Sequence, residues 1–222
     1  MNIQIPITKK RILNHFNYFW WAYVLIIALA FLGWNLIHTV TRYQSPPELK
    51  VEWFFGGYQT DNGTGGETLM ERAHQEVLPD MEVVSYLQIM TDDAYGTQSL
   101  TTWAFAGEGD LYTLTRDKFQ NMAGGGTMMN LQPYVDSGEL NVDGIDLTGC
   151  YVTVPESGEQ WLCGIPMSAL PGLAQYNLYC DDHVMCILIN GGNDANTVKL
   201  LGWMLENFRE PAELPAEAVP AV

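Results

Sequence analysis

Aromatic and acidic residues, together with one glycine, gather where three apolar segments of this sequence begin or end. They are Trp53, Phe54 and Tyr58 after the first segment, Asp92, Asp93 and Tyr95 after the second, and Gly109, Asp110 and Tyr112 around the third. Rings of this kind stack on the faces of sugars, and carboxylates accept hydrogen bonds from sugar hydroxyls, so the set could bind a carbohydrate. The alternative is that Trp53 and Phe54 belong to the core and that Asp110 only caps a turn.

Other chemistry has less support in the sequence. Residues 61–67 offer oxygen ligands on a loop, but they lack the ligand spacing of an EF-hand calcium site. The pair Asp92-Asp93 could serve a glycosidase, yet adjacent residues in a strand point to opposite faces. His74 lies in a predicted helix and is expected at the surface. There is no P-loop, dinucleotide-binding, HExxH or GxSxG motif. We therefore expect neither an enzyme nor a cofactor.

The segments that must position the candidate residues alternate between strand-like and helix-like patterns. Strands are predicted at residues 49–55, 81–90 and 111–115, and helices at residues 67–77, 93–106 and 116–122. Such alternation is typical of a mostly parallel sheet with helices covering its faces. Because open sheets of this class bind ligands beyond the carboxyl ends of their strands, the candidate residues are expected at that edge.

The second half of the chain has a different pattern. Residues 151–154 and 160–163 flank a Pro-Glu-Ser-Gly sequence with the composition of a hairpin loop. Two further strands are predicted, at residues 172–178 and 185–189. Asp194 is expected to cap a final helix at residues 196–208. Together with the first half, this predicts one α/β domain.

A long uncharged segment near the N-terminus predicts a transmembrane helix at residues 16–40. Roughly 20 apolar residues suffice to cross a bilayer, and aromatic residues stand at both ends of the segment, as they do at membrane interfaces. Lys9, Lys10 and Arg11 precede it and favour a cytoplasmic N-terminus with an extracellular C-terminal domain. A signal peptide cleaved after Ala30 is the alternative, and it would export the same domain.

Charge and composition divide the rest of the chain. We expect a basic cytoplasmic stub at residues 1–15, a linker at 41–48, a folded domain at 49–209 and a disordered Pro/Ala/Glu-rich tail at 210–222. From residue 51 onward, 25 acidic residues face five basic ones. A surface this acidic repels phosphate backbones, which argues against nucleic-acid binding.

Several short motifs resemble, in order, the sugar-type extracellular solute-binding proteins of bacterial ABC importers. The passage KVEWFFGG at residues 50–57 resembles the family's first strand and the loop after it, and residues 69–88 resemble its first helix and second strand. Ala106-Gly-Glu-Gly-Asp110 and the Leu-Gln-Pro-Tyr of residues 131–134 resemble the block around its third strand. Cys163-Gly-Ile-Pro-Met167 resembles a later strand.

This resemblance implies a periplasmic-binding-protein-like fold, a sugar ligand and an ABC permease or other membrane protein as partner. Family members are commonly twice as long and close two lobes over the ligand, whereas fewer than sixty residues follow Pro166 here. The resemblance therefore implies a single lobe held by a helix, accessory to an importer. The alternative is an interaction module of a membrane complex that keeps the fold and has lost the ligand.

The chain has four cysteines, Cys150, Cys163, Cys180 and Cys186. If residues 155–158 form the loop of a regular hairpin, Cys150 lies opposite Cys163 and within bonding reach. An exported domain favours such disulfides.

The second cysteine pair depends on a turn. Cys180 and Cys186 are too far apart to bond along one straight strand, and they can pair only if Asp181-Asp182 forms a turn. A metal held by Cys180, His183 and Cys186 is the alternative, and it needs a fourth ligand.

Overall fold

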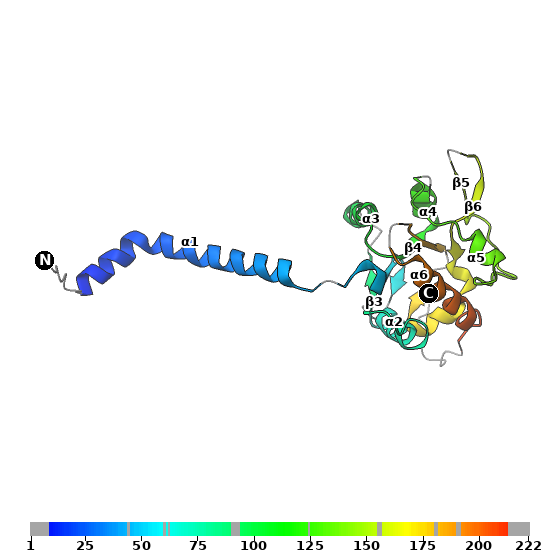
Figure 1. Cartoon of the computed structure of the whole chain (residues 1–222), viewed down its shortest axis with the longest axis horizontal. Coiled ribbons are helices and arrows are strands. Elements are labelled where there is room, and N and C mark those ends of the chain that lie inside the picture. The colour runs from blue at the N-terminus through cyan, green and yellow to red at the C-terminus, as the bar shows by residue number, and fades with distance from the viewer. Residues whose placement is uncertain are drawn as a thin grey trace, which may run out of the picture. The chain divides into compact units, whose positions relative to one another are not determined.

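The computed structural model describes residues 9–43, 45–59, 61, 63–89, 94–123, 125–154, 157–179, 182–189 and 192–212. The chain forms two compact units, Met1–Gln44 and Ser45–Val222 (Figure 1).

The N-terminal unit is a single helix, α1 (Lys9–Thr41). Its segment Leu13–Thr41 is long and apolar enough to cross a membrane, and none of the most apolar window in it is buried. Large apolar side chains such as Trp20, Ile26 and Trp34 are all more than half exposed. The helix therefore presents an apolar surface along its length.

The second unit is built on a mixed five-stranded sheet with strand order β3-β1-β4-β9-β7. Its strands are β1 (Lys50–Phe55), β3 (Val83–Gln88), β4 (Leu111–Thr115), β9 (His183–Ile187) and β7 (Ile165–Pro166). β1 pairs in parallel with β3 and with β4, as the alternation of strands and helices predicts. β9 runs antiparallel to both β4 and β7.

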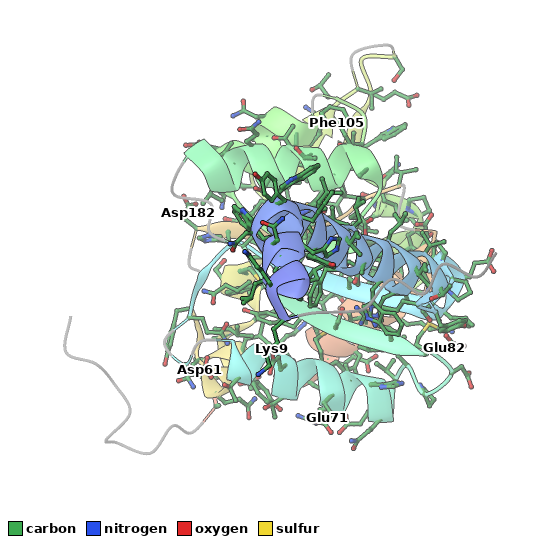
Figure 2. The ribbon with its side chains drawn as sticks, turned by 90° about the vertical axis from the view of Figure 1, so that its left-hand side faces the viewer. Lys9, Asp61, Glu71, Glu82, Phe105 and Asp182 are labelled. Atoms are coloured by element: carbon green, nitrogen blue, oxygen red, sulfur yellow. The ribbon has the colours of Figure 1, made fainter. Side chains whose placement is uncertain are left out.

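Helices cover both faces of the sheet. α2 (Thr64–Glu76) and α6 (Asp194–Asn207) lie on one face, and α3 (Ala94–Ala106) and α4 (Arg116–Ala123) lie on the other (Figures 1 and 2). On the first face, the Arg72 guanidinium lies 5.4 Å from the ring centre of Trp203, and the Trp203 indole donates a 3.0 Å hydrogen bond to Glu76. These contacts join α2 to α6.

The interior strand β1 supplies aromatic rings to both faces. Trp53 and Phe55 contact Tyr86 on one side, with ring centres 5.5 and 5.7 Å apart. Phe54 contacts Trp103 and Tyr112 on the other, at 5.5 and 5.0 Å. Successive side chains of a strand point to opposite faces, so three consecutive aromatics require a helix layer on each side.

The antiparallel direction of β9 differs from the mostly parallel sheet that the sequence predicts. β8 (Leu178–Tyr179) pairs with β2 (Tyr58–Gln59), which follows the carboxyl end of β1. Only three residues separate β8 from β9, so the chain re-enters the sheet from the carboxyl edge and must run against β4. The pattern at residues 185–189 correctly predicts a strand there, but the direction of that strand depends on the pairing of β8 with β2.

The hairpin prediction is confirmed with its register. β5 (Tyr151–Thr153) pairs with β6 (Gln160–Leu162), with Tyr151 opposite Leu162. The Cys163 amide donates a 3.0 Å hydrogen bond to the Cys150 carbonyl, which places these two cysteines opposite each other.

Two predictions for the second half are wrong. Residues 172–178 form mainly the 3₁₀ helix η3 (Pro171–Tyr176), because Pro171 cannot donate to a strand ladder and Asn177 ends the turn with a left-handed φ of 58°. Asn193, rather than Asp194, is the N-cap of α6. The remaining short elements are α5 (Gln132–Asp136), η1 (Pro47–Leu49) and η2 (Met167–Ala169).

Candidate functional site

The predicted ligand residues do not share one edge of the sheet. Trp53 is in register with Leu111, so Asp110 lies beside Glu52, near the start of β1. Gly109 and Asp110 thus belong to the amino edge of the parallel strands. Tyr58 lies after β1, at the carboxyl edge. This differs from the expectation of a single ligand face, because Gly109 and Asp110 precede their strand whereas Tyr58 follows its own.

Five of the predicted ligand residues are buried. Trp53, Phe54 and Tyr112 belong to the hydrophobic core, Asp110 is only 3% exposed, and Gly109 before it is also buried. The Trp53 indole donates a 2.9 Å hydrogen bond to Thr113, and the Tyr112 hydroxyl donates to the Glu108 carbonyl. The polar side-chain atoms of Trp53 and Tyr112 therefore have partners within the fold. This agrees with the alternative that these aromatic residues belong to the core.

Asp110 ties the start of β4 to β1. Its Oδ2 atom accepts a 2.8 Å hydrogen bond from the Glu52 amide, while its buried Oδ1 atom has no hydrogen-bond partner in the described chain. Burial, with the nearby Glu52 and Asp194 carboxylates, raises the pKa of Asp110 to about 7, although the Glu52 amide and Lys50 act in the opposite direction. Before it, Gly109 has a φ of +75°, which L side chains rarely adopt, and an added Cβ atom would lie 3.1 Å from the ring of Phe54.

The remaining predicted ligand residues are described only in part. Tyr58 opens β2 and Tyr95 lies in the first turn of α3. Asp92 and Asp93 lie outside the described residues. A ligand site that uses these four residues stays a prediction.

The loop considered for calcium, residues 61–67, has a structural role at the carboxyl edge of the parallel strands. The Asp61 Oδ2 atom accepts a 2.7 Å hydrogen bond from the Gly65 amide and a 3.2 Å bond from the Asn177 amide group. Asp61 therefore satisfies a free amide in the first turn of α2 and links it to the segment before β8. Nearby, the Tyr86 hydroxyl donates a 2.6 Å hydrogen bond to Gln59.

Three of the four cysteines form a buried group, and Cys180 lies outside the described residues. Cys150, Cys163 and Cys186 are present as free thiols, so the predicted disulfides remain predictions. Burial raises the pKa of Cys150 and of Cys163 to about 11. Burial also raises the pKa of Cys186, and the nearby Cys163 and Cys150 add to that shift, which places all three thiols in one region.

A cleft that the sequence analysis did not single out lies between α3 and α4. It has a volume of about 290 Å³ and is lined by Thr101, Ala104, Phe105, Asn121, Met122, Gly125 and Thr127. No charged side chain lines it. The signal in the sequence is that α3 contains no Asp, Glu, Lys or Arg although the domain is strongly acidic.

Comparison with known proteins gives similarity to solved structures alone. No protein-family model matches the chain, and no curated protein matches it. An extracellular solute-binding protein family 1 from Alicyclobacillus acidocaldarius subsp. acidocaldarius DSM 446 is 16% identical, with a TM-score of 0.41 over 55% of this chain and 29% of its own. A de novo designed cysteine esterase, ECH19, is 21% identical with the same TM-score, over 55% of this chain and 28% of its own.

A third solved structure is also similar over part of the chain. It is the galacto-N-biose-/lacto-N-biose I-binding protein of the ABC transporter from Bifidobacterium longum, in complex with lacto-N-biose. The identity is 13% and the TM-score 0.39, over 60% of this chain and 33% of that one. The chain thus spans a third or less of each of these three structures.

The environment of Asp110 predicts a stability that falls as the pH rises. An unfolded aspartate has a pKa of about 3.9, so between about pH 4 and 7 the folded chain holds a proton that the unfolded chain lacks. The free energy of unfolding therefore decreases over this window. At pH 8 we expect Asp110→Asn to be more stable than the wild type by roughly 2–4 kcal/mol. This range follows from the raised pKa of Asp110, since each unit of pKa shift corresponds to about 1.4 kcal/mol of free energy of unfolding. Urea unfolding at pH 5 and pH 8 measures the difference.

The exposed Asp117 gives the matched control, since Asp117→Asn removes the same charge from the surface. We expect it to leave the pH dependence of the wild type intact. An unchanged pH dependence in Asp110→Asn would contradict the assignment of a buried, raised-pKa carboxyl.

The hairpin register predicts which disulfide forms on oxidation. Cys150 and Cys163 lie directly next to the paired strands β5 and β6, joined by a backbone hydrogen bond, and opposite residues in such a pair have Cβ atoms close enough to bridge, about 4–5 Å apart. Mass mapping of the non-reduced protein after oxidation should find a peptide that joins these two residues. A dominant Cys163–Cys186 or Cys150–Cys186 peptide would instead show that the third buried thiol takes over the pairing.

Proposed function

We propose that this chain is a single-pass membrane protein with a cytoplasmic N-terminus and an extracellular solute-binding-like domain. The observation that carries the proposal is the exposed apolar surface of α1, of which no residue in the most apolar window is buried. Such a surface is stable in hydrocarbon and costly in water. The basic residues before the helix support the orientation, since cytoplasmic ends carry an excess of Lys and Arg.

Carbohydrate is the ligand class that the proposal assigns to the domain, as an accessory to an ABC importer. The order of the motifs in the sequence supports it. The acidity of the domain supports a neutral ligand over an anionic one. A binding role without catalysis agrees with the lack of any catalytic motif in the sequence.

A second candidate function is a protein-interaction module of a membrane complex that keeps the fold without the ligand. The burial of Trp53, Phe54, Asp110 and Tyr112 favours it, because these side chains cannot reach a ligand without opening the core. Binding experiments separate the two functions.

We expect the full chain in detergent micelles to gain thermal stability from one class of neutral oligosaccharide. A ligand that binds only the folded state stabilises it by RT ln(1 + [L]/Kd), about 2.7 kcal/mol at a hundred times Kd. Scanning fluorimetry with malto-, xylo- and galacto-oligosaccharides measures the shift, with a charged sugar acid as the control for charge selectivity. A flat response to the whole panel from a cooperatively unfolding protein would rule out carbohydrate binding and leave the interaction module.

A further inference from the structure

The α3–α4 cleft has the features of a built contact surface for a neutral ligand. It is bounded by Thr101, Ala104 and Phe105 of α3, by two residues of α4 and by the loop that follows. Its volume of about 290 Å³ lies near the lower end of the roughly 300–1,000 Å³ typical of ligand sites. The cleft therefore has room for one sugar unit of a longer chain, with the rest in solvent.

Phe105 is the most unusual residue of this cleft. The residue is 78% exposed, although the neighbouring Ala104 is buried and Trp103 packs against the core. Figure 2 shows Phe105 on the helix at the side of the sheet opposite α2. An exposed ring beside a concave surface is the group on which the apolar face of a pyranose stacks.

The polar groups of the cleft suit hydroxyls better than charges. The Thr101 hydroxyl donates a 2.9 Å hydrogen bond to the Thr97 carbonyl, so its oxygen keeps lone pairs free to accept from a ligand. Thr127 is placed in the same way, since its hydroxyl donates to the Met122 carbonyl at 3.3 Å. Asn121 adds an amide that both donates and accepts. A ligand hydroxyl can satisfy each of these groups.

Charge also selects against other ligands. No lining residue is charged, and α3 carries no charged side chain along its whole length. An ionic ligand would find no counter-charge in the cleft, while the acidic domain around it repels anions. A neutral molecule with an apolar face and many hydroxyls matches this lining.

We propose that the α3–α4 cleft is a carbohydrate-contact site in which Phe105 stacks against one sugar ring and Thr101, Asn121 and Thr127 bond its hydroxyls. This inference rests on the proposed function. It adds a site separate from the loops at the carboxyl ends of the strands: α3 leads within five residues into the start of β4, so Phe105 lies toward the amino edge.

The test compares sugar affinity in the wild type with that in Phe105→Ala, using full-length protein in detergent micelles. Isothermal titration calorimetry with the oligosaccharide that gives the largest thermal shift should show affinity at least tenfold weaker in Phe105→Ala. Removal of a mostly exposed ring leaves the core intact, which the melting temperature checks. Asn121→Ala, which removes the amide that bonds the ligand hydroxyls, should weaken binding as well.

Tyr151→Ala provides the matched control. Tyr151 is a partly exposed aromatic residue, 41% exposed, on the hairpin strand β5 and outside the cleft. We expect its removal to leave affinity unchanged. Wild-type affinity in both cleft variants would overturn the cleft assignment while leaving carbohydrate binding in place. The absence of binding by the wild type would overturn the proposed function together with this inference.

Discussion

Trp53, Phe54 and Phe55 stand in succession on the interior strand β1, and their rings leave the strand on alternate faces. Each face must then be closed by helices, because a buried Trp or Phe side chain contributes on the order of 2–3 kcal/mol through burial. The rings of Trp53 and Phe55 meet Tyr86 on the α2 side, and Phe54 meets Trp103 of α3 and Tyr112 of β4 on the other. The three-layer arrangement follows from this requirement.

The same requirement decides where recognition can take place. Three of the candidate aromatic residues, Trp53, Phe54 and Tyr112, are packed inside the domain, and Trp53 and Tyr112 donate hydrogen bonds to neighbouring groups. The Asp110 side chain is buried, and its Oδ2 atom accepts a hydrogen bond from the Glu52 amide. Phe105 remains accessible to a ligand, because it lies on the exposed side of α3 whereas the other side of this helix packs against the core.

Local patterns in the sequence predict the elements of the first half well. Residues 111–115 form the predicted strand, and residues 94–106 form the helix that Gly107 ends. The hairpin register follows from its loop length, which placed Cys150 opposite Cys163. In these cases the signal is a short periodicity together with a Gly or Pro at the boundary.

The parts that the sequence could not predict depend on distant contacts. The direction of β9 follows from the pairing of β8 with β2, which joins residues more than a hundred positions apart. The burial of Asp110 depends on its register beside Glu52, and an acidic residue before a strand gives no sign of that. The cleft at Phe105 depends on the approach of α3 to α4, which the sequence does not predict. The sequence shows only that residues 94–106 carry no charge.

Membrane anchoring with an extracellular domain is the central claim of the proposed function, and the membrane partner depends on it. Protease treatment of intact cells that express the chain with an N-terminal epitope tag tests it most directly. The account predicts that residues 45–222 are digested from outside while the tagged fragment with α1 stays in the membrane. A domain protected until the cells are lysed, or released into the medium after cleavage near Ala30, would contradict it.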